Sequence, residues 1–225
     1  MNYQIDAPGS AIRTTVKLPA SKSISNRALI LNALSYSAYD VENLSDCDDT
    51  NLMVKALNSN DRDFNVGAAG TTMRFLTAFL SKVVGEWTIT GTERMKNRPI
   101  KVLVDALNAL GARIEYMEKE GYPPLRIFGS ALQGGEISLP GNVSSQYISA
   151  ILMIAPLTEN GVMLHLEGAI ISRPYIHITL QLMEQYGVRA SWTENTIKVL
   201  PQEYKPIRFT VESDWSAASY WYEIM

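Results

Sequence analysis

The spacing of apolar residues changes repeatedly along the 225-residue chain. Apolar positions three to four residues apart predict helices, and alternating or β-branched runs predict strands between them. The predicted helices begin near Ser23, Thr71, Arg98, Ser144, Pro174 and Trp215. The predicted strands are 39–42, 87–90, 125–128, 162–166, 197–200 and 208–211, and 14–18 is a further β-prone run. This alternation indicates an α/β or α+β chain.

The predicted helix starts are regularly spaced. Those at 23, 98 and 174 follow one another at nearly equal intervals, and so do those at 71, 144 and 215. A repeat of this kind predicts three copies of one unit, each with two helices. If the copies pack about a pseudo-threefold axis, several helix starts face one end of the domain. That end would gather basic side chains, namely Lys22, Arg27, Arg74, Arg94, Lys96, Arg98 and Arg173.

One stretch, residues 18–27, combines a lysine, an arginine and three serines with no acidic residue. Its serines are good N-cap residues, so the first helix is predicted to begin inside it. Free N–H groups and the positive end of the helix dipole favour an anion at such a start. The stretch therefore indicates a phosphate or carboxylate pocket, with a solvated surface loop as the alternative.

Composition excludes several classes of function. A formal net charge of −3 and a pI near 5.5 argue against a nucleic-acid-binding protein. The single cysteine, Cys47, excludes an internal disulfide, and two histidines are too few for a histidine-rich metal centre. No apolar run reaches the length of a membrane span, and the N-terminus lacks a signal-peptide core. We therefore expect a cytoplasmic protein without a metal, a cofactor, a nucleic-acid partner or a membrane partner.

The third predicted unit is shorter than the others. It begins near Ser172, and the chain stops at Met225 inside the sixth helical pattern. We interpret the sequence as a fragment of a longer protein.

Six short blocks occur in order along nearly the whole chain: 22–27 (KSISNR), 69–74 (AGTTMR), 94–100 (RMKNRPI), 143–147 (VSSQY), 171–176 (ISRPYI) and 211–214 (VESD). Together they resemble the signatures of the 5-enolpyruvylshikimate-3-phosphate synthase family. The resemblance implies an α+β fold, an enolpyruvyl transferase-like inside-out α/β barrel lobe of three βαβαββ repeats about a pseudo-threefold axis. It places the lobe at 14–212, a crossover segment at 1–13 and the start of a crossover helix at 213–225, both leading to a missing second lobe.

The resemblance also implies a reaction. In this family the enolpyruvyl group of phosphoenolpyruvate is transferred to the 5-hydroxyl of shikimate 3-phosphate, and phosphate is released. The pathway leads to chorismate and the aromatic amino acids. The implied partners are these two small anions and the C-terminal lobe of the same chain, and we expect a full-length monomer. The fragment alone is expected to be inactive.

Site residues follow from the resemblance position by position. Lys22 is the implied catalytic residue, a candidate proton donor that reaches both substrates. The implied contacts to shikimate 3-phosphate are Lys22, Ser23, Arg27, Ser144, Ser145, Gln146, Ser172 and Tyr175. The implied contacts to phosphoenolpyruvate are Lys22, Gly70, Arg98 and Gln146. Tyr175 could instead belong to the core, and Asp214 could only cap the last helix.

Two residues depart from the family pattern, and two alternative functions remain open. Ala68 stands where the family usually has asparagine and Phe75 where it usually has proline, which leaves the position of Gly70 and the response to the inhibitor glyphosate open. The sister family that uses a UDP-sugar is disfavoured, because it typically has a Lys-Asn pair at the first helix. A non-catalytic module that binds a phosphorylated ligand is the other alternative.

Overall fold

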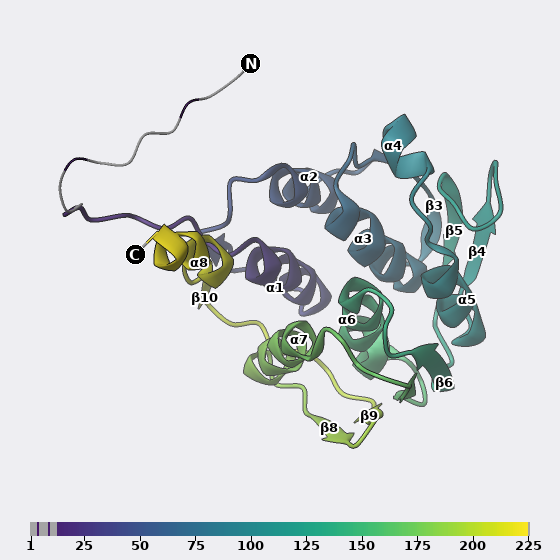
Figure 1. Ribbon diagram of the computed structural model, residues 1–225. Coiled ribbons are helices and arrows are strands. Elements are labelled where there is room, and N and C mark those ends of the chain that lie inside the picture. The colour runs from purple at the N-terminus through teal and green to yellow at the C-terminus, as the bar shows by residue number, and fades with distance from the viewer. Residues whose placement is uncertain (1–3, 5–8, 10–12, 225) are drawn as a thin grey trace.

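The computed structural model describes residues 4, 9 and 13–224. Its helices are α1 (Lys22–Leu34), α2 (Asp48–Leu57), α3 (Gly70–Lys82), α4 (Glu93–Lys96), α5 (Lys101–Ala109), α6 (Ser145–Ile154), the 3-10 helix η1 (Ala155–Leu157), α7 (Arg173–Gln185) and α8 (Trp215–Ile224). Its strands are β1 (Val41–Glu42), β2 (Asp63–Asn65), β3 (Gly85–Thr90), β4 (Arg113–Tyr116), β5 (Leu125–Gly129), β6 (Gly135–Pro140), β7 (Val162–Glu167), β8 (Ala190–Thr193), β9 (Thr196–Val199) and β10 (Phe209–Thr210). Figure 1 shows their arrangement.

Three helices form the centre of the molecule. The inner helices α1, α3 and α6 contact one another, and α2, α5 and α7 each lie between two of them. The inner helices are apolar on several sides, as a buried helix must be: every residue of α6 except Gln146 is buried, and α3 buries all but Phe79 and Lys82. Met73, Phe75 and Leu76, a helical apolar stripe in the sequence, lie in this core, each at most 1% exposed.

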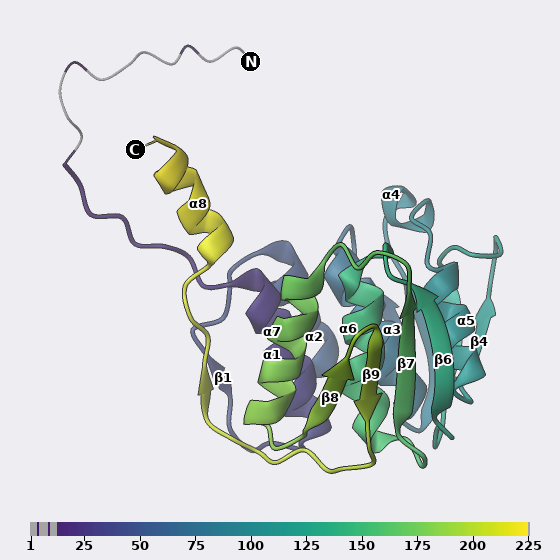
Figure 2. The same ribbon diagram turned by 60° about the horizontal axis from the view of Figure 1, so that its bottom comes forward.

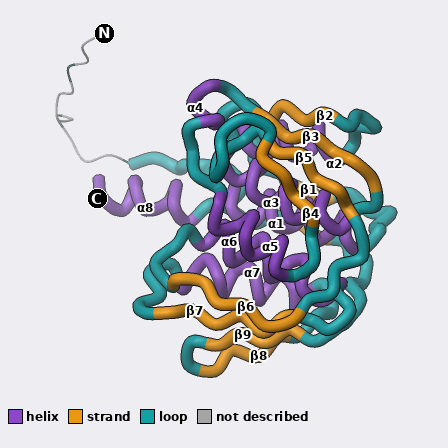
Figure 3. The backbone as a smooth tube through the Cα atoms, turned by 90° about the vertical axis from the view of Figure 1, so that its right-hand side faces the viewer, coloured by secondary structure: helices purple, strands orange, loops and turns teal. Residues whose placement is uncertain are grey.

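Two four-stranded sheets cover this bundle (Figure 3). One has the order β2-β3-β5-β4 and the other β6-β7-β9-β8. In each, the first two strands are parallel and the last two form an antiparallel hairpin. Both units have the chain order βαβαββ, with a parallel crossover through an inner helix. The predicted α+β repeat fold is confirmed.

The first unit differs from the other two. Among the residues that the structure describes it has two strands, and β1 pairs in parallel with β10 from much later in the sequence, Val41 opposite Phe209. Helix α2 ends at Leu57 and β2 begins at Asp63, which leaves no length for a closing hairpin. The β-prone run 14–18 forms no strand, because β10 takes the place beside β1 that the first strand occupies in the other units.

The predicted equivalence of the helices was therefore wrong. Helix α2 was not predicted, and its presence makes α1 equivalent to the inner helices α3 and α6, rather than to α5 and α7 as the spacing indicated. The inner helices begin at Lys22, Gly70 and Ser145, so the first interval is clearly shorter than the second. The missing hairpin accounts for the difference. The even spacing of 23, 98 and 174 was a coincidence.

Helix α8 stands away from the body of the lobe (Figure 2). Its only buried residue is Ala218, while Trp215 is 71% and Tyr220 74% exposed. Asp214 begins the helix by accepting hydrogen bonds from the backbone N–H groups of Ser216 (2.7 Å) and Ala217 (3.4 Å), so the capping role foreseen for Asp214 is confirmed. The predicted crossover segment 1–13 lies almost entirely outside the described residues. Within 13–224, no helix has the length and apolarity needed to cross a membrane.

Candidate functional site

The first turns of α1, α3, α6 and α7 gather at one end of the lobe, as the parallel crossovers require (Figure 2). Local sequence fixes two of these starts. Ser21 is the N-cap of α1 and accepts from the Ile24 N–H at 3.4 Å, and Ser144 is the N-cap of α6 and accepts from the Gln146 N–H at 3.3 Å. Serine is favoured at this position because its hydroxyl satisfies a free helical N–H. The predicted gathering of helix starts is observed.

Asp49, in the first turn of α2, connects the starts of α1 and α3. Helix α3 has no side-chain cap of its own, since Ala69 occupies its N-cap. Asp49 Oδ1 instead accepts from the Thr71 N–H at 2.9 Å, and the Asp49 carbonyl accepts from the Thr72 hydroxyl at 2.6 Å. Asp49 Oδ2 also lies 4.0 Å from Nζ of Lys22, whose side chain is 46% exposed. One carboxylate therefore lies beside both the start of α3 and Lys22, the candidate proton donor.

Gly70 lies directly against two arginines. A Cβ at this position would be 2.8 Å from Nη1 of Arg74 and would overlap the guanidinium of Arg98. Arg74 donates to the Gly70 carbonyl at 2.7 Å, and it is only 6% exposed. Burial, together with the nearby charges of Arg74 and Arg94, lowers the pKa of Arg98, and Asp49 opposes that shift. Cations held this close together favour an anion between them.

The start of α6 faces the start of α3. Gln146 Nε2 donates to the Thr71 hydroxyl at 3.1 Å, and the Tyr147 hydroxyl donates to the Pro99 carbonyl at 2.6 Å. The Tyr147 ring also lies 5.3 Å from the Arg74 guanidinium carbon. These contacts join the start of α6, which carries predicted contacts to shikimate 3-phosphate, to the neighbours of Gly70 and Arg98. Ser144 is exposed and Ser145 is 9% exposed.

The start of α7 supplies Ser172 and Tyr175. Ser172 is the N-cap residue of α7 without a side-chain capping bond, so that bond does not occupy its hydroxyl. Tyr175 is 41% exposed, so the alternative that it belongs to the core is wrong. Ser23, one turn before Arg27, is half-buried. Arg27 itself is 2% exposed, with its guanidinium between α1, α6 and α7.

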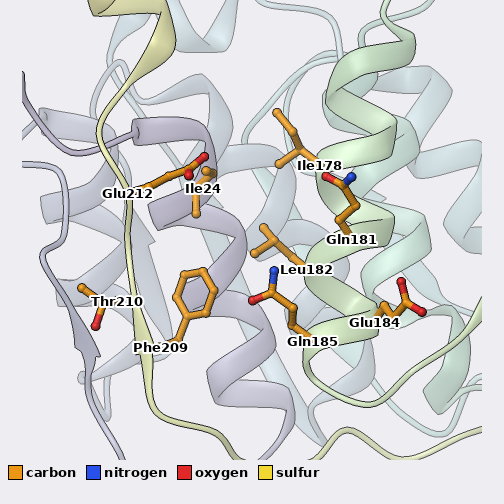
Figure 4. A pocket seen from close by; sticks show the side chains of 9 residues that line it. All are labelled: Ile24, Ile178, Gln181, Leu182, Glu184, Gln185, Phe209, Thr210 and Glu212. Carbon is orange, nitrogen blue, oxygen red and sulfur yellow. The ribbon is translucent and has the colours of Figure 1, made fainter.

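Two pockets lie near these residues. One of about 480 Å³ adjoins the site at Asp49 and Ala69 and is also lined by Ala68. A larger one of about 610 Å³ lies between α1, α7 and β10, where Phe209 faces Leu182 and Gln185 (Figure 4). The larger pocket contains none of the residues predicted to bind substrate, so volume alone does not locate the site.

Sequence reasoning missed Asp49, Thr71 and Tyr147. The hydrogen bonds of Asp49 and Thr71 join different helices, and partners so far apart in the chain are not revealed by periodicity. A helix start without a capping residue, such as the one at Ala69, is the one signal that could have prompted a search for a distant acceptor.

The fold and the site together define a class: an α+β repeat lobe whose helix starts, arginines and lysine gather at one end, an arrangement suited to small phosphorylated or carboxylated ligands. The sequence matches the family described as EPSP synthase (3-phosphoshikimate 1-carboxyvinyltransferase) over residues 7–60 and 58–224. The chain belongs to this family.

Individual relatives agree with this assignment. A 3-phosphoshikimate 1-carboxyvinyltransferase of Bacteroides fragilis (strain YCH46) is 61% identical over 225 residues, which is 100% of this chain and 55% of the relative. One of Vibrio campbellii is 43% identical, covering 95% of this chain and 57% of the relative. The EPSP synthase from Acinetobacter baumannii has a TM-score of 0.80 at 21% identity, covering 91% of this chain and 51% of that structure, and it supports the fold. The chain therefore spans about half the length of the relatives it matches.

Proposed function

We propose that the chain is the N-terminal, substrate-binding half of an enzyme that transfers the enolpyruvyl group of phosphoenolpyruvate to the 5-hydroxyl of shikimate 3-phosphate. In this reaction the 5-hydroxyl loses its proton as its oxygen bonds to the enol carbon, while the methylene carbon gains a proton and becomes a methyl group. Loss of a proton from that methyl group and cleavage of the carbon–oxygen bond to phosphate then restore the double bond and release phosphate. Both substrates are anions, so their encounter needs fixed positive charge. The enzyme is proposed to act in the cytoplasm.

The observation that carries the proposal is the Gly70 cluster. Arg74 and Arg98 lie side by side against Gly70 at the start of α3, next to the Thr71 N–H that Asp49 caps, and two cations held this close together favour a small anion beside them. We assign the phosphoenolpyruvate phosphate to this cluster. Gln146, whose amide donates a hydrogen bond to the Thr71 hydroxyl, is assigned as a further contact to phosphoenolpyruvate. Nζ of Lys22 lies 4.0 Å from Asp49, which also caps this helix start, and this proximity supports the assignment of Lys22 as the proton donor to the methylene carbon.

The second substrate is assigned to the starts of α1, α6 and α7. Ser144 and Ser145 supply hydroxyls and free N–H groups for the shikimate phosphate, and Ser172 adds a further hydroxyl. Ser23, Arg27 and Tyr175 are assigned to the shikimate ring and its carboxylate. The exposed aromatic side chains of α8 are proposed to face the second lobe, which would supply the remaining catalytic groups.

The test is a chimera. Residues 1–225 would replace the matching residues of the Bacteroides fragilis relative, whose 61% identity favours a compatible interface. We expect the chimera to release phosphate from phosphoenolpyruvate only when shikimate 3-phosphate is present. The 225-residue chain alone should bind shikimate 3-phosphate in calorimetry without turnover.

A different result would favour another function. Binding of a phosphorylated ligand by a folded chimera that has no turnover would support the non-catalytic binding module. Turnover with a UDP-sugar in place of shikimate 3-phosphate would support the sister family.

A further inference from the structure

A buried hydroxyl cluster surrounds Arg27 at the junction of α1, α6 and α7. Arg27 Nε donates to Thr179 Oγ1 at 2.7 Å, Nη2 to Ser149 Oγ at 2.9 Å and Nη1 to the Ser23 carbonyl at 2.8 Å. Ser149 and Thr179 are both 0% exposed. Among the residues described, no carboxylate forms an ion pair with Arg27.

The direction of every proton in this cluster is fixed. An arginine can only donate and a carbonyl can only accept. Thr179 lies 2.9 Å from the Tyr175 carbonyl and so donates its single proton there. Ser149, 2.8 Å from Thr179, must then donate to Thr179 while it accepts from Arg27. Both hydroxyls therefore use their single proton within the cluster, and Arg27 is held through all three of its guanidinium nitrogens.

From this geometry we infer that Thr179 and Ser149 are positioning residues, which align Arg27 and the first turns of three helices for the anionic groups of shikimate 3-phosphate. The inference rests on the proposed function. Thr179 holds the carbonyl of Tyr175, Ser149 lies one turn after Ser145, and Arg27 holds the carbonyl of Ser23. The cluster is therefore connected to three helical turns, those of Tyr175, Ser145 and Ser23. Each of these turns carries a predicted contact to shikimate 3-phosphate.

The cluster does not reach the other substrate. None of its hydrogen bonds involves α3 or the residues around Arg98, where phosphoenolpyruvate is assigned. Its contact with α3 is the ring of Phe75, 5.3 Å from the guanidinium carbon of Arg27. Loss of the hydroxyls should therefore weaken one substrate and spare the other, which a general loss of stability would not do.

The experiment compares four variants by calorimetry on the 225-residue chain and by kinetics on the chimera. Thr179→Val keeps the side-chain shape without the hydroxyl, Ser149→Ala removes the second hydroxyl, and Thr179→Ser restores the first. Thr77→Val is the matched control, because Thr77 is also 0% exposed and donates to a carbonyl of its own helix at 2.7 Å, but lies on α3.

We expect Thr179→Val and Ser149→Ala to weaken shikimate 3-phosphate binding about tenfold or more, as for a lost hydrogen bond to a charged group. The KM of shikimate 3-phosphate should rise by the same factor, whereas the KM of phosphoenolpyruvate should change less than about twofold. Thr179→Ser should recover most of the affinity for shikimate 3-phosphate. Thr77→Val should match the unchanged protein.

Equal binding by Thr179→Val and the unchanged protein, or an equal rise in both KM values, would overturn the inference alone. No binding of shikimate 3-phosphate by the unchanged chain, together with an inactive chimera, would overturn the proposed function and the inference with it. If Thr179→Val does not fold, the same measurements on Ser149→Ala test the inference. Ser149→Thr, which restores the hydroxyl, then serves as the rescue variant.

Discussion

Gly70 and Arg98 lie so close together that even one added carbon at position 70 would overlap the guanidinium. The glycine is needed for this contact rather than for its backbone conformation, since it begins α3 with ordinary helical geometry. A side chain at this position would have to displace Arg98, Arg74 or the phosphoenolpyruvate proposed to lie between them.

The first prediction concerns Gly70→Ala. The methyl group should push Arg98 outward and raise the KM of phosphoenolpyruvate in the chimera about tenfold or more, the effect of weakening a charged hydrogen bond. Binding of shikimate 3-phosphate to the chain should stay within about twofold, which serves as the internal control. Equal loss of both ligands would contradict the assignment of phosphoenolpyruvate to this cluster.

A second prediction separates the two roles of Asp49. Asp49→Asn keeps an oxygen for the Thr71 N–H and removes the charge beside Lys22, so kcat of the chimera should fall by less than about fivefold, since a half-exposed ion pair is worth at most about 1 kcal/mol. Asp49→Ala also removes the acceptor and should lower the free energy of unfolding by about 1 kcal/mol. Urea denaturation of both variants tests this, and equal stabilities would count against Asp49 as the cap of α3.

The third prediction uses two serines at helix starts. Ser144→Ala and Ser145→Ala should each weaken shikimate 3-phosphate binding in calorimetry by about tenfold, as expected for a charged hydrogen bond to phosphate. Ser21→Ala is the matched control, because it removes the N-cap of α1 without removing a predicted ligand contact. Comparable weakening by Ser21→Ala would show that cap loss, rather than phosphate contact, explains the result.

The fourth prediction concerns the cost of burying Arg27. Burial lowers the pKa of Arg27 from its ordinary value to about 10. Below about pH 10 the group is charged in both the folded and the unfolded state, so its burial costs a constant ~3 kcal/mol. As pH rises above about 10 the folded state loses the proton before the unfolded state does, and that cost is relieved.

Arg27→Met removes the charge and keeps most of the volume. At pH 7 we expect the free energy of unfolding of the chain to stay equal or to rise by about 1–3 kcal/mol, since replacing a buried ion by an apolar side chain often stabilises. Shikimate 3-phosphate binding should be lost. A variant that is less stable by more than about 1 kcal/mol would show that the hydroxyl cluster offsets the desolvation of Arg27.

The sequence predicted much of this fold because its signals are local. The helix start at Ser21, the strand at 162–166 and the apolar faces of α3 and α6 follow from capping and periodicity within a few residues. Helix α2 was missed although its acidic first turn is itself a signal for a helix start. Its N-cap residue, Cys47, forms no side-chain capping bond, and only Thr50 and Met53 of the helix are buried. Short strands such as β2 carry too few residues for a period to show.

The candidate site was predictable only in part. Lys22, Arg98 and the 144–146 group were found through the ordered blocks of the resemblance. Asp49, Ser149 and Thr179 were not, because each acts through a contact between helices that only the packed structure brings together. The pairing of β1 with β10 was missed for the same reason.

The pairing of β1 with β10 has a consequence for how the chain acquires its structure. Val41 pairs with Phe209, near the other end of the chain, whereas the second and third units close within the continuous segments 63–129 and 135–199. During synthesis those two units can fold as soon as they leave the ribosome, but the first cannot close until residue 210 has emerged. A contact this distant in sequence is costly in chain entropy. The last step in folding this lobe should therefore pair residues 41–42 with residues 209–210, and that step brings the Lys22 N–H to the Asp214 carboxylate.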